Sequence, residues 1–369
     1  MHRLPSLEIT DRSSCQFLLF EQLSDLWKQV AQQHDITPSS RTSPHIVLVD
    51  AHVRKAHRKR LEQVFSPENC RYYEIPPGEG SKSMELYRQI IDFAFSGPLR
   101  RNTPLIAIGG GVTGDLSGFA AASLMRGLPL YHVPTTLLAM VDSAIGGKTG
   151  INHPFGKNTI GAFYHPRAVL FDTDFLTSLP QREWLCGLSE VLKYGYIREP
   201  ELLEKAVRLA DPDQRTPELL KSVIDSSVRI KTEIVSLDAR ESGIRAWLNF
   251  GHTFAHALET LDSYRNINHG EAVYAGMMAA LYVSRRYLGA SVSDRTLIDL
   301  KSIYHLDMET YTSRSEELVT LMGHDKKNRD HAIQLVLLDE SGKPTVKRVE
   351  DRTLLKDAWN HVFNVLQGS

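Results

Sequence analysis

Short apolar runs alternate with stretches of helical periodicity through the first half of the chain. Strands are predicted by apolar runs at residues 14–20, 45–50, 72–79 and 104–111. Between them, apolar positions recur at helical spacing in residues 21–33, 51–65 and 83–95. This alternation predicts an α/β fold, with a parallel-rich sheet and helices on both of its faces.

The pattern changes near Pro180. Strand signals are then nearly absent until residues 332–338, and long helical patterns occupy residues 181–197, 217–237, 254–261 and 270–288. We therefore expect two domains, an α/β domain over residues 1–178 and a mainly α-helical C-terminal domain over residues 179–369.

Composition narrows the class of protein. The 369 residues include 43 Lys plus Arg and 44 Asp plus Glu, a net charge of −1 that lacks the basic excess of a general nucleic-acid binder. No run of about 18 apolar residues predicts a transmembrane helix. The first residues lack the apolar core of a signal peptide, and the three cysteines, Cys15, Cys70 and Cys186, are widely spaced. We expect a cytoplasmic protein with no membrane partner.

A glycine loop follows the strand predicted at residues 104–108. Gly109, Gly111 and Gly114 satisfy the GxGxxG pattern, and a helical segment begins directly after them. Glycines allow close approach of a pyrophosphate, and a helix N-terminus favours its negative charge. A tight glycine turn is the alternative, but the context favours a dinucleotide. No acidic residue ends a strand about 20 residues downstream, so Asp50 is the candidate for the ribose contact.

Residues 134–166 combine Gly, Thr, Asn and Lys with apolar positions throughout. The stretch could be a long ordered connector. We favour a lining loop that presents Asp142, Lys148, Lys157 and Asn158 to an anionic ligand, because lysines between glycines suit phosphate.

A metal site is suggested by three histidines and a glutamate. His252 and His256 stand at i and i+4, on one helix face, and His269 opens another apolar helix. Two histidines and a carboxylate such as Glu190, with a position left open, form a catalytic zinc set. A lone histidine is usually a hydrogen-bonded structural residue. The spacing of His252 and His256 favours a metal site but does not show that both are ligands.

Several blocks together resemble 3-dehydroquinate synthase, a member of the sugar-phosphate cyclases. They occur in that family's order at residues 109–127, 133–166, 189–195, 241–259, 269–273 and 325–327. The resemblance runs from about Asp50 to Leu338 and is weak before that.

The resemblance implies an NAD-dependent, metal-dependent phosphorus-oxygen lyase of the shikimate pathway, usually a homodimer, with zinc or sometimes cobalt. It would convert 3-deoxy-D-arabino-heptulosonate 7-phosphate to 3-dehydroquinate and phosphate. The steps it implies are transient oxidation by NAD, phosphate elimination, re-reduction and aldol cyclisation. NAD would act catalytically, with no net reduced cofactor.

The resemblance also implies residue roles. The metal ligands would be Glu190, His252 and His269, which leaves His256 to the substrate. The NAD contacts would be Asp50, Glu79, Lys82, Gly110, Gly111, Asp115, Thr135, Thr136, Lys157, Phe175 and Ser178. The substrate contacts would be Arg126, Asp142, Lys148, Asn158, Lys193, Lys231, Arg245, Asn249, His256 and Lys326. Glu241 and His256 hold the positions of proton acceptors.

Two other activities stay open. A sister cyclase that makes 2-deoxy-scyllo-inosose or a valiolone would share the NAD and metal sets, but its substrate lacks the carboxylate. Arg245, Asn249, His256 and Lys231 favour the carboxylated substrate. A metal-dependent polyol dehydrogenase would share the two-domain plan but release NADH.

Overall fold

The chain forms two compact units in the computed structural model. The structure describes residues 15–19, 22–238, 243–263, 265–323 and 332–367. The first unit comprises Met1–Thr135 and Gly147–Thr177, and the second comprises Thr136–Gly146 and Ser178–Ser369. The sequence had indicated one boundary near residue 178. The structure instead packs residues 136–146 with the second unit, because this segment lies against α6 (Gln181–Ile197) and α8 (Pro217–Leu237).

A six-stranded sheet forms the centre of the first unit, and all of its strand pairs are parallel, as predicted. Its strands lie in the order β1-β8-β5-β4-β2-β3. Their bounds are β1 (Gln16–Leu19), β2 (His45–Asp50), β3 (Cys70–Ile75), β4 (Leu105–Gly109), β5 (Leu130–Pro134) and β8 (Ala168–Phe171).

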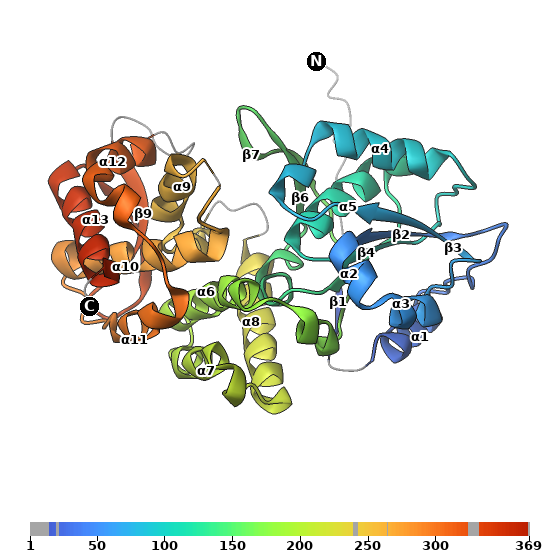
Figure 1. Ribbon diagram of the computed structural model, residues 1–369, viewed down its shortest axis with the longest axis horizontal. Helices are drawn as coiled ribbons and strands as arrows, with labels where there is room; N and C mark the ends of the chain where they lie inside the picture. The colour runs from blue at the N-terminus through green and yellow to red at the C-terminus, as the bar shows by residue number, and fades with distance from the viewer. Residues whose placement is uncertain (1–14, 20–21, 239–242, 264, 324–331, 368–369) are drawn as a thin grey trace, which may run out of the picture. The chain divides into compact units, whose positions relative to one another are not determined.

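Helices cover both faces of this sheet (Figure 1). One apolar cluster includes Leu26 of α1 (Leu23–Gln33) and Leu61 of α3 (Arg58–Val64). The cluster on the other face includes Ile90 of α4 (Met84–Phe95) and Leu116 of α5 (Gly111–Ser123). Alternate residues of β2, β3, β4 and β5 enter the two clusters, which is why buried strands such as β2 and β4 appear as nearly continuous apolar runs in the sequence.

Two local predictions were wrong in detail. The helix expected over residues 51–65 is broken at His57 into α2 (Ala51–Ala56) and α3, and the break turns the His57 ring edge-on to Phe175 at 4.9 Å. Residues 148–163, expected as part of a loop, form an antiparallel hairpin of β6 (Lys148–His153) and β7 (Gly156–Phe163).

The second unit is mainly helical, as predicted. α10 (His269–Leu288) is buried along most of its length and packs against α6, α9 (His252–Leu261) and α13 (Arg352–Gln367). The other helices are α7 (Glu201–Ala210), α8, α11 (Arg295–Tyr304) and α12 (Ser315–Gly323). An antiparallel pair, β9 (Ile333–Leu338) and β10 (Pro344–Val349), completes it. Among the described residues, no helix has the length and apolar character needed to span a membrane.

Candidate functional site

The order of the parallel strands creates a switch point in the first unit. After β2 the chain adds β3 on one side, then returns to place β4 on the other side of β2. Ligands of open α/β sheets bind beyond the carboxyl ends of strands at such a point. Asp50 ends β2 and Gly109 ends β4, and the preceding residues Val49 and Ile108 are paired neighbours. The switch point therefore explains how Asp50, distant in sequence, reaches the glycine loop.

The glycine loop leads into the N-terminus of α5, whose first residue is Gly111. A Cβ added to Gly109 would lie 2.6 Å from the Thr113 side chain, so this position has no room for a larger residue. None of the loop glycines at 109, 110, 111 and 114 adopts a positive φ. Gly109 thus needs to be glycine for space rather than for a left-handed turn. The N-terminus of α5 that follows offers main-chain amides to an anion.

A buried lysine links the candidate nucleotide residues. Lys82 Nζ lies 2.7 Å from Asp115 Oδ2 and 3.6 Å from Glu79 Oε1, and it also donates to Asn158 Oδ1. Burial alone would lower the pKa of Lys82, but Asp115 and Glu79 raise it, so the ammonium is charged at neutral pH. Asn152 donates to Glu79 Oε1 at 2.8 Å and was missed by the sequence reasoning.

The other candidate NAD contacts lie on different elements and differ in their hydrogen bonds and in their burial. Asp50 caps α2 by accepting from the amides of His52 and Val53. The Thr135 amide donates to Gly109 O, and Thr136 Oγ1 accepts from the Ala139 amide. Phe175 as a whole is only 1% exposed, within the apolar core, so its ring is not open to a ligand. Lys157 lies in β7, and Ser178 ends the helical turn Thr173–Ser178.

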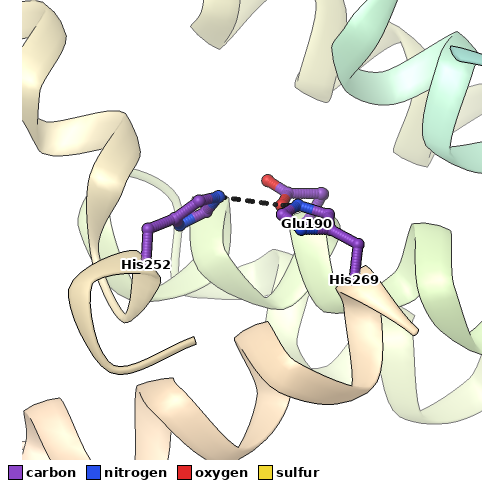
Figure 2. Close-up of side chains that lie close together, drawn as sticks. All are labelled: Glu190, His252 and His269. Atoms are coloured by element: carbon purple, nitrogen blue, oxygen red, sulfur yellow. Dashed lines mark ion pairs between the residues drawn. The ribbon is translucent and has the colours of Figure 1, made fainter. Parts of the chain in front are cut away.

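Three side chains of the second unit form the candidate metal centre. Glu190, His252 and His269 each offer an atom, and these atoms all lie within 4.8 Å of one another (Figure 2). The Nε2 atoms of both histidines lie 3.4 Å from Glu190 Oε1. His256, considered on helix spacing, lies outside this group, and its ring is exposed.

Two glycines allow the helices of this centre to approach one another. Gly251 precedes His252 with φ +80°, and a Cβ there would lie 2.8 Å from the Met277 amide of α10. A Cβ on Gly270, directly after His269, would lie 2.3 Å from the Cα of Cys186 in α6. Larger side chains at these positions would push the helices apart, so both glycines are required for the spacing of the three candidate ligands.

The charges around the centre are tightly coupled. Burial would raise the pKa of Glu190, but the adjacent Lys193 ammonium and the two histidines lower it well below its usual range. Burial, followed by Lys193, lowers the pKa of His252 to about 4. Burial would also lower the pKa of His269, but contacts with Glu190 and Glu259 raise it to about 10. A cation at this position would compete with that proton for the ring nitrogen.

These residues fit a divalent metal. Glu190 is fully buried, with the Lys193 ammonium against its Oε2, and its Oε1, which faces the two histidines, accepts no hydrogen bond of normal geometry from a described residue. A buried anion with unused lone pairs is costly unless a cation is nearby. Two imidazoles and one carboxylate are the donor set of a catalytic zinc site, which keeps a further coordination position for water or substrate.

Asp142 anchors a second charged group in the same unit. It lies in the π-helical turn Ala139–Ser143, and its Oδ1 is 2.8 Å from Lys231 Nζ and 3.8 Å from Lys193 Nζ. Burial would raise the pKa of Asp142, but the two ammonium groups, Lys231 first, lower it to about 2. Tyr194 donates to the same oxygen at 2.7 Å and was also missed from the sequence.

Arg245 is 2% exposed, in the helical turn Ile244–Asn249. Its guanidinium donates to Gly146 O at 3.2 Å, and its amide donates to Asp238 Oδ2 at 3.1 Å. Asn249 ends the same turn, three residues before the first residue of α9. A guanidinium held inside the protein is suited to pair with a carboxylate.

The remaining substrate candidates of the first unit lie on exposed or strained backbone. Lys148 opens β6 and is exposed, and Asn158 in β7 has φ 51°. Arg126 has φ 64° and follows Met125 with φ 53°. Left-handed conformations in residues other than glycine are uncommon and concentrate at functional sites. Glu241 and Lys326 lie outside the described residues.

The missed residues carry no recognisable pattern in the sequence. Tyr194 and Glu259 lie in helical stretches that carry other polar residues, with Lys193 and Thr260 directly beside them, and Asn152 stands in the glycine-rich run. The only available signal was the helical phase, since Glu259 stands seven residues after His252, on the same face of a helix.

Comparison with known proteins gives a consistent result over most of the chain. A family model described as 3-dehydroquinate synthase N-terminal matches residues 72–186, and one described as 3-dehydroquinate synthase C-terminal matches residues 187–328. A 3-dehydroquinate synthase of Salinibacter ruber is 41% identical over 318 residues, which cover 85% of this chain and 87% of the relative.

Two solved structures share the fold. The 2-epi-5-epi-valiolone synthase of Streptomyces hygroscopicus subsp. jinggangensis, with NAD+ and Zn2+ bound, has a TM-score of 0.83 at 24% identity and covers 98% of this chain and 99% of its own. A 2-deoxy-scyllo-inosose synthase complexed with carbaglucose-6-phosphate, NAD+ and Co2+ has a TM-score of 0.77 at 25% identity, with 94% and 96% coverage.

Proposed function

The chain belongs to the 3-dehydroquinate synthase family, and from this premise we propose that it converts 3-deoxy-D-arabino-heptulosonate 7-phosphate to 3-dehydroquinate and phosphate. The single observation that carries the proposal within the structure is the cluster that the buried Glu190 forms with the partly buried His252 and His269. This cluster and the charged group around Asp142 lie in one unit, a short distance apart, because Lys193 contacts both Glu190 and Asp142.

Glu190, His252 and His269 would hold the divalent ion, with zinc favoured and cobalt possible by the donor set. A bound ion supplies Lewis-acid stabilisation of a developing alkoxide on the substrate. Lys193 lies against Glu190 and keeps this carboxylate ionised, so Glu190 can act as a ligand at neutral pH. Lys231 and Tyr194 fix the orientation of Asp142, which we assign, with Lys193, to the substrate hydroxyls.

We assign Arg245, together with Asn249 and Lys231, to binding of the substrate carboxylate. The burial of Arg245 supports this role, because a buried guanidinium loses water and gains most from a bidentate anion. The assignment separates this substrate from sugar phosphates that lack a carboxylate. His256, exposed on α9, is assigned to the substrate phosphate and to proton transfer, together with Glu241 and Lys326.

The first unit is assigned to NAD. The switch point at Asp50, the accessible N-terminus of α5 and the charged group of Lys82, Asp115 and Glu79 support this role. NAD bound there would supply a hydride acceptor. The remaining assigned contacts are Gly110, Gly111, Thr135, Lys157 and Phe175 of this unit, with Thr136 and Ser178 of the second unit. Lys148, Asn158 and Arg126 of the first unit are assigned to the substrate phosphate.

The hairpin of β6 and β7 supports a homodimer. Phe155 at its turn is 79% exposed and Phe163 in β7 is 57% exposed, and exposed aromatic residues are enriched at protein interfaces. Light scattering should give twice the chain mass of 41.6 kDa. Replacing both residues by serine should shift the mass toward that of a single chain, and an unchanged mass would exclude this hairpin as the interface.

A cytoplasmic location is part of the proposal. All three cysteines, Cys15, Cys70 and Cys186, are free thiols, as expected in a reducing compartment. Fractionation of the native host should recover the protein with cytosolic enzymes, and recovery with membranes would contradict this location.

A panel of three substrates tests the proposed activity. The protein, loaded with zinc and NAD, is incubated separately with the heptulosonate 7-phosphate, glucose 6-phosphate and sedoheptulose 7-phosphate. The proposal expects phosphate release and a cyclic product from the first alone. Comparable turnover of either neutral-ended sugar phosphate would instead support a sister cyclase.

A further inference from the structure

His269 lies between two carboxylates. Its Nε2 is 3.4 Å from Glu190 Oε1, and its other ring nitrogen, Nδ1, is 3.5 Å from Glu259 Oε1. Glu259 belongs to α9 and is 3% exposed, and Glu190 is fully buried in α6. A carboxylate is rarely buried to this extent without an ionic partner, so the contact with His269 gives Glu259 a physical reason for its burial.

The second histidine of the centre has the same arrangement with a neutral partner. His252 Nε2 also lies 3.4 Å from Glu190 Oε1, and its Nδ1 lies 3.2 Å from the main-chain oxygen of Phe250. Each ring thus directs one nitrogen toward the shared carboxylate and the other toward an oxygen outside the centre. Histidines that bind a metal characteristically donate their other N–H to a carboxylate or carbonyl, which fixes the tautomer.

Helix α9 provides both a candidate ligand and this outer carboxylate. Glu259 follows His252 by seven residues, or about two helical turns, and therefore lies on the same face. His269 opens α10, the helix that packs against α9. The ring of His269 is thus carried by α10 and contacted by Glu259 of α9 at one nitrogen and by Glu190 of α6 at the other.

We propose that Glu259 is a positioning residue, which keeps the proton of His269 on Nδ1 and directs the Nε2 lone pair toward the divalent ion. The inference rests on the proposed metal site and adds a residue that does not touch the ion. A carboxylate, with its full negative charge, also makes the imidazole ring more basic than a main-chain oxygen would. The ring is then a stronger ligand for the metal ion. His269 should therefore be the histidine whose metal binding depends most on its outer partner.

Metal affinity of Glu259→Gln provides the test. Glutamine keeps the size of the side chain and removes the charge. The metal-free protein is titrated with Zn2+ against a competing chelator and with Co2+ by its visible absorption. We expect affinity to fall by about 10–100-fold and the Co2+ spectrum to change, while the melting temperature of the metal-free protein stays near that of the wild type.

Glu199→Gln is the matched control. Glu199 is a partly buried glutamate of the same unit, bonded to Ser226 and Arg229. This variant should bind Zn2+ and Co2+ like the wild type. If Glu259→Gln shows wild-type affinity and spectrum, the positioning role is overturned while the metal site stands. If the wild type itself binds neither ion at Glu190, His252 and His269, the proposed function fails together with this inference.

A measurement on the wild type keeps the inference testable should the variant fail to fold. Long-range proton–nitrogen correlation of the zinc-loaded protein reports which nitrogen of each histidine carries the proton. We expect His269 to be protonated at Nδ1 and bound through Nε2. Protonation at Nε2, with Nδ1 as the metal-binding nitrogen, would overturn the role of Glu259.

Discussion

The Tyr194 hydroxyl donates a 2.7 Å hydrogen bond to Asp142 Oδ1, and the tyrosine is fully buried. Asp142 also accepts from Lys231, so a neutral donor and a cation hold the same carboxylate. Burial, with Asp142 nearby, raises the pKa of Tyr194 well above its ordinary value, so the hydroxyl remains a donor throughout the physiological range. The orientation of Asp142 therefore depends on a residue with no direct part in the assigned chemistry.

Tyr194→Phe removes this donor without changing the shape of the ring. A hydrogen bond to a charged group contributes about 1.5–3 kcal/mol, and we expect kcat/KM to fall because Asp142 loses a fixed orientation. Tyr274→Phe is the control, since its buried hydroxyl donates to Leu297 O, away from Asp142. Steady-state kinetics and denaturant unfolding of both variants distinguish a role in orienting Asp142 from a general contribution to stability. Equal kcat/KM losses in the two would make the role of Tyr194 merely structural.

His269→Ala and His256→Ala should separate metal binding from catalysis. His269 belongs to the candidate ligand group, and His256, one helical turn after His252, does not. We expect His269→Ala to lose both bound metal and activity, and His256→Ala to keep the metal while losing activity. Metal content by atomic emission, after purification with limiting zinc, gives the comparison. A full metal complement in His269→Ala would remove this residue from the ligand set.

Gly111→Val tests the nucleotide loop. Gly111 is the first residue of α5 and has no positive φ, so valine can adopt its backbone conformation. The added side chain should obstruct a pyrophosphate at the helix N-terminus and weaken NAD binding at least tenfold, about 1.4 kcal/mol. Gly114→Ala is the control, because its Cβ would face His132 at 3.4 Å. Fluorescence titration with NAD measures both, and unchanged affinity in Gly111→Val would mean that NAD binds elsewhere.

Arg245 should determine preference for a carboxylated substrate. Arg245→Ala leaves the substrate carboxylate unpaired, a loss typically of about 2–5 kcal/mol. Lysine at this position should restore only part of the rate, because it cannot form the planar, bidentate pair. NAD and metal affinities should be unchanged. Nearly full activity in Arg245→Ala, measured as kcat/KM, would place the carboxylate elsewhere.

Sequence patterning predicted the layers of the fold better than its local details. β2 and β4 are buried from both sides, so nearly all of their residues are apolar. Such an apolar run can be recognised in the sequence without knowledge of the tertiary contacts. The hairpin of β6 and β7 was missed because glycines dilute its alternation, and Gly150 pairs directly with Gly161 across it. Main-chain pairing, which leaves no side-chain pattern, specifies this element.

The candidate site was predictable only in part. Helix spacing alone associated His252 with His256, whereas the structure brings His252 to His269 and Glu190 from three separate helices. The family resemblance supplied that grouping, because contacts between distant segments leave no local pattern in one sequence. Tyr194 and Glu259 were missed for the same reason, since each acts through a contact between helices or turns.

The fate of the nicotinamide distinguishes 3-dehydroquinate synthase activity from that of a dehydrogenase. The zinc-loaded protein is given excess 3-deoxy-D-arabino-heptulosonate 7-phosphate and far less NAD than substrate. Phosphate, 3-dehydroquinate and NADH are then followed together. We predict that phosphate and 3-dehydroquinate form in equal amounts, far beyond the NAD supplied, with no accumulation of NADH. Formation of one NADH per substrate consumed, with the reaction ending when NAD is exhausted, would contradict the account and indicate a dehydrogenase.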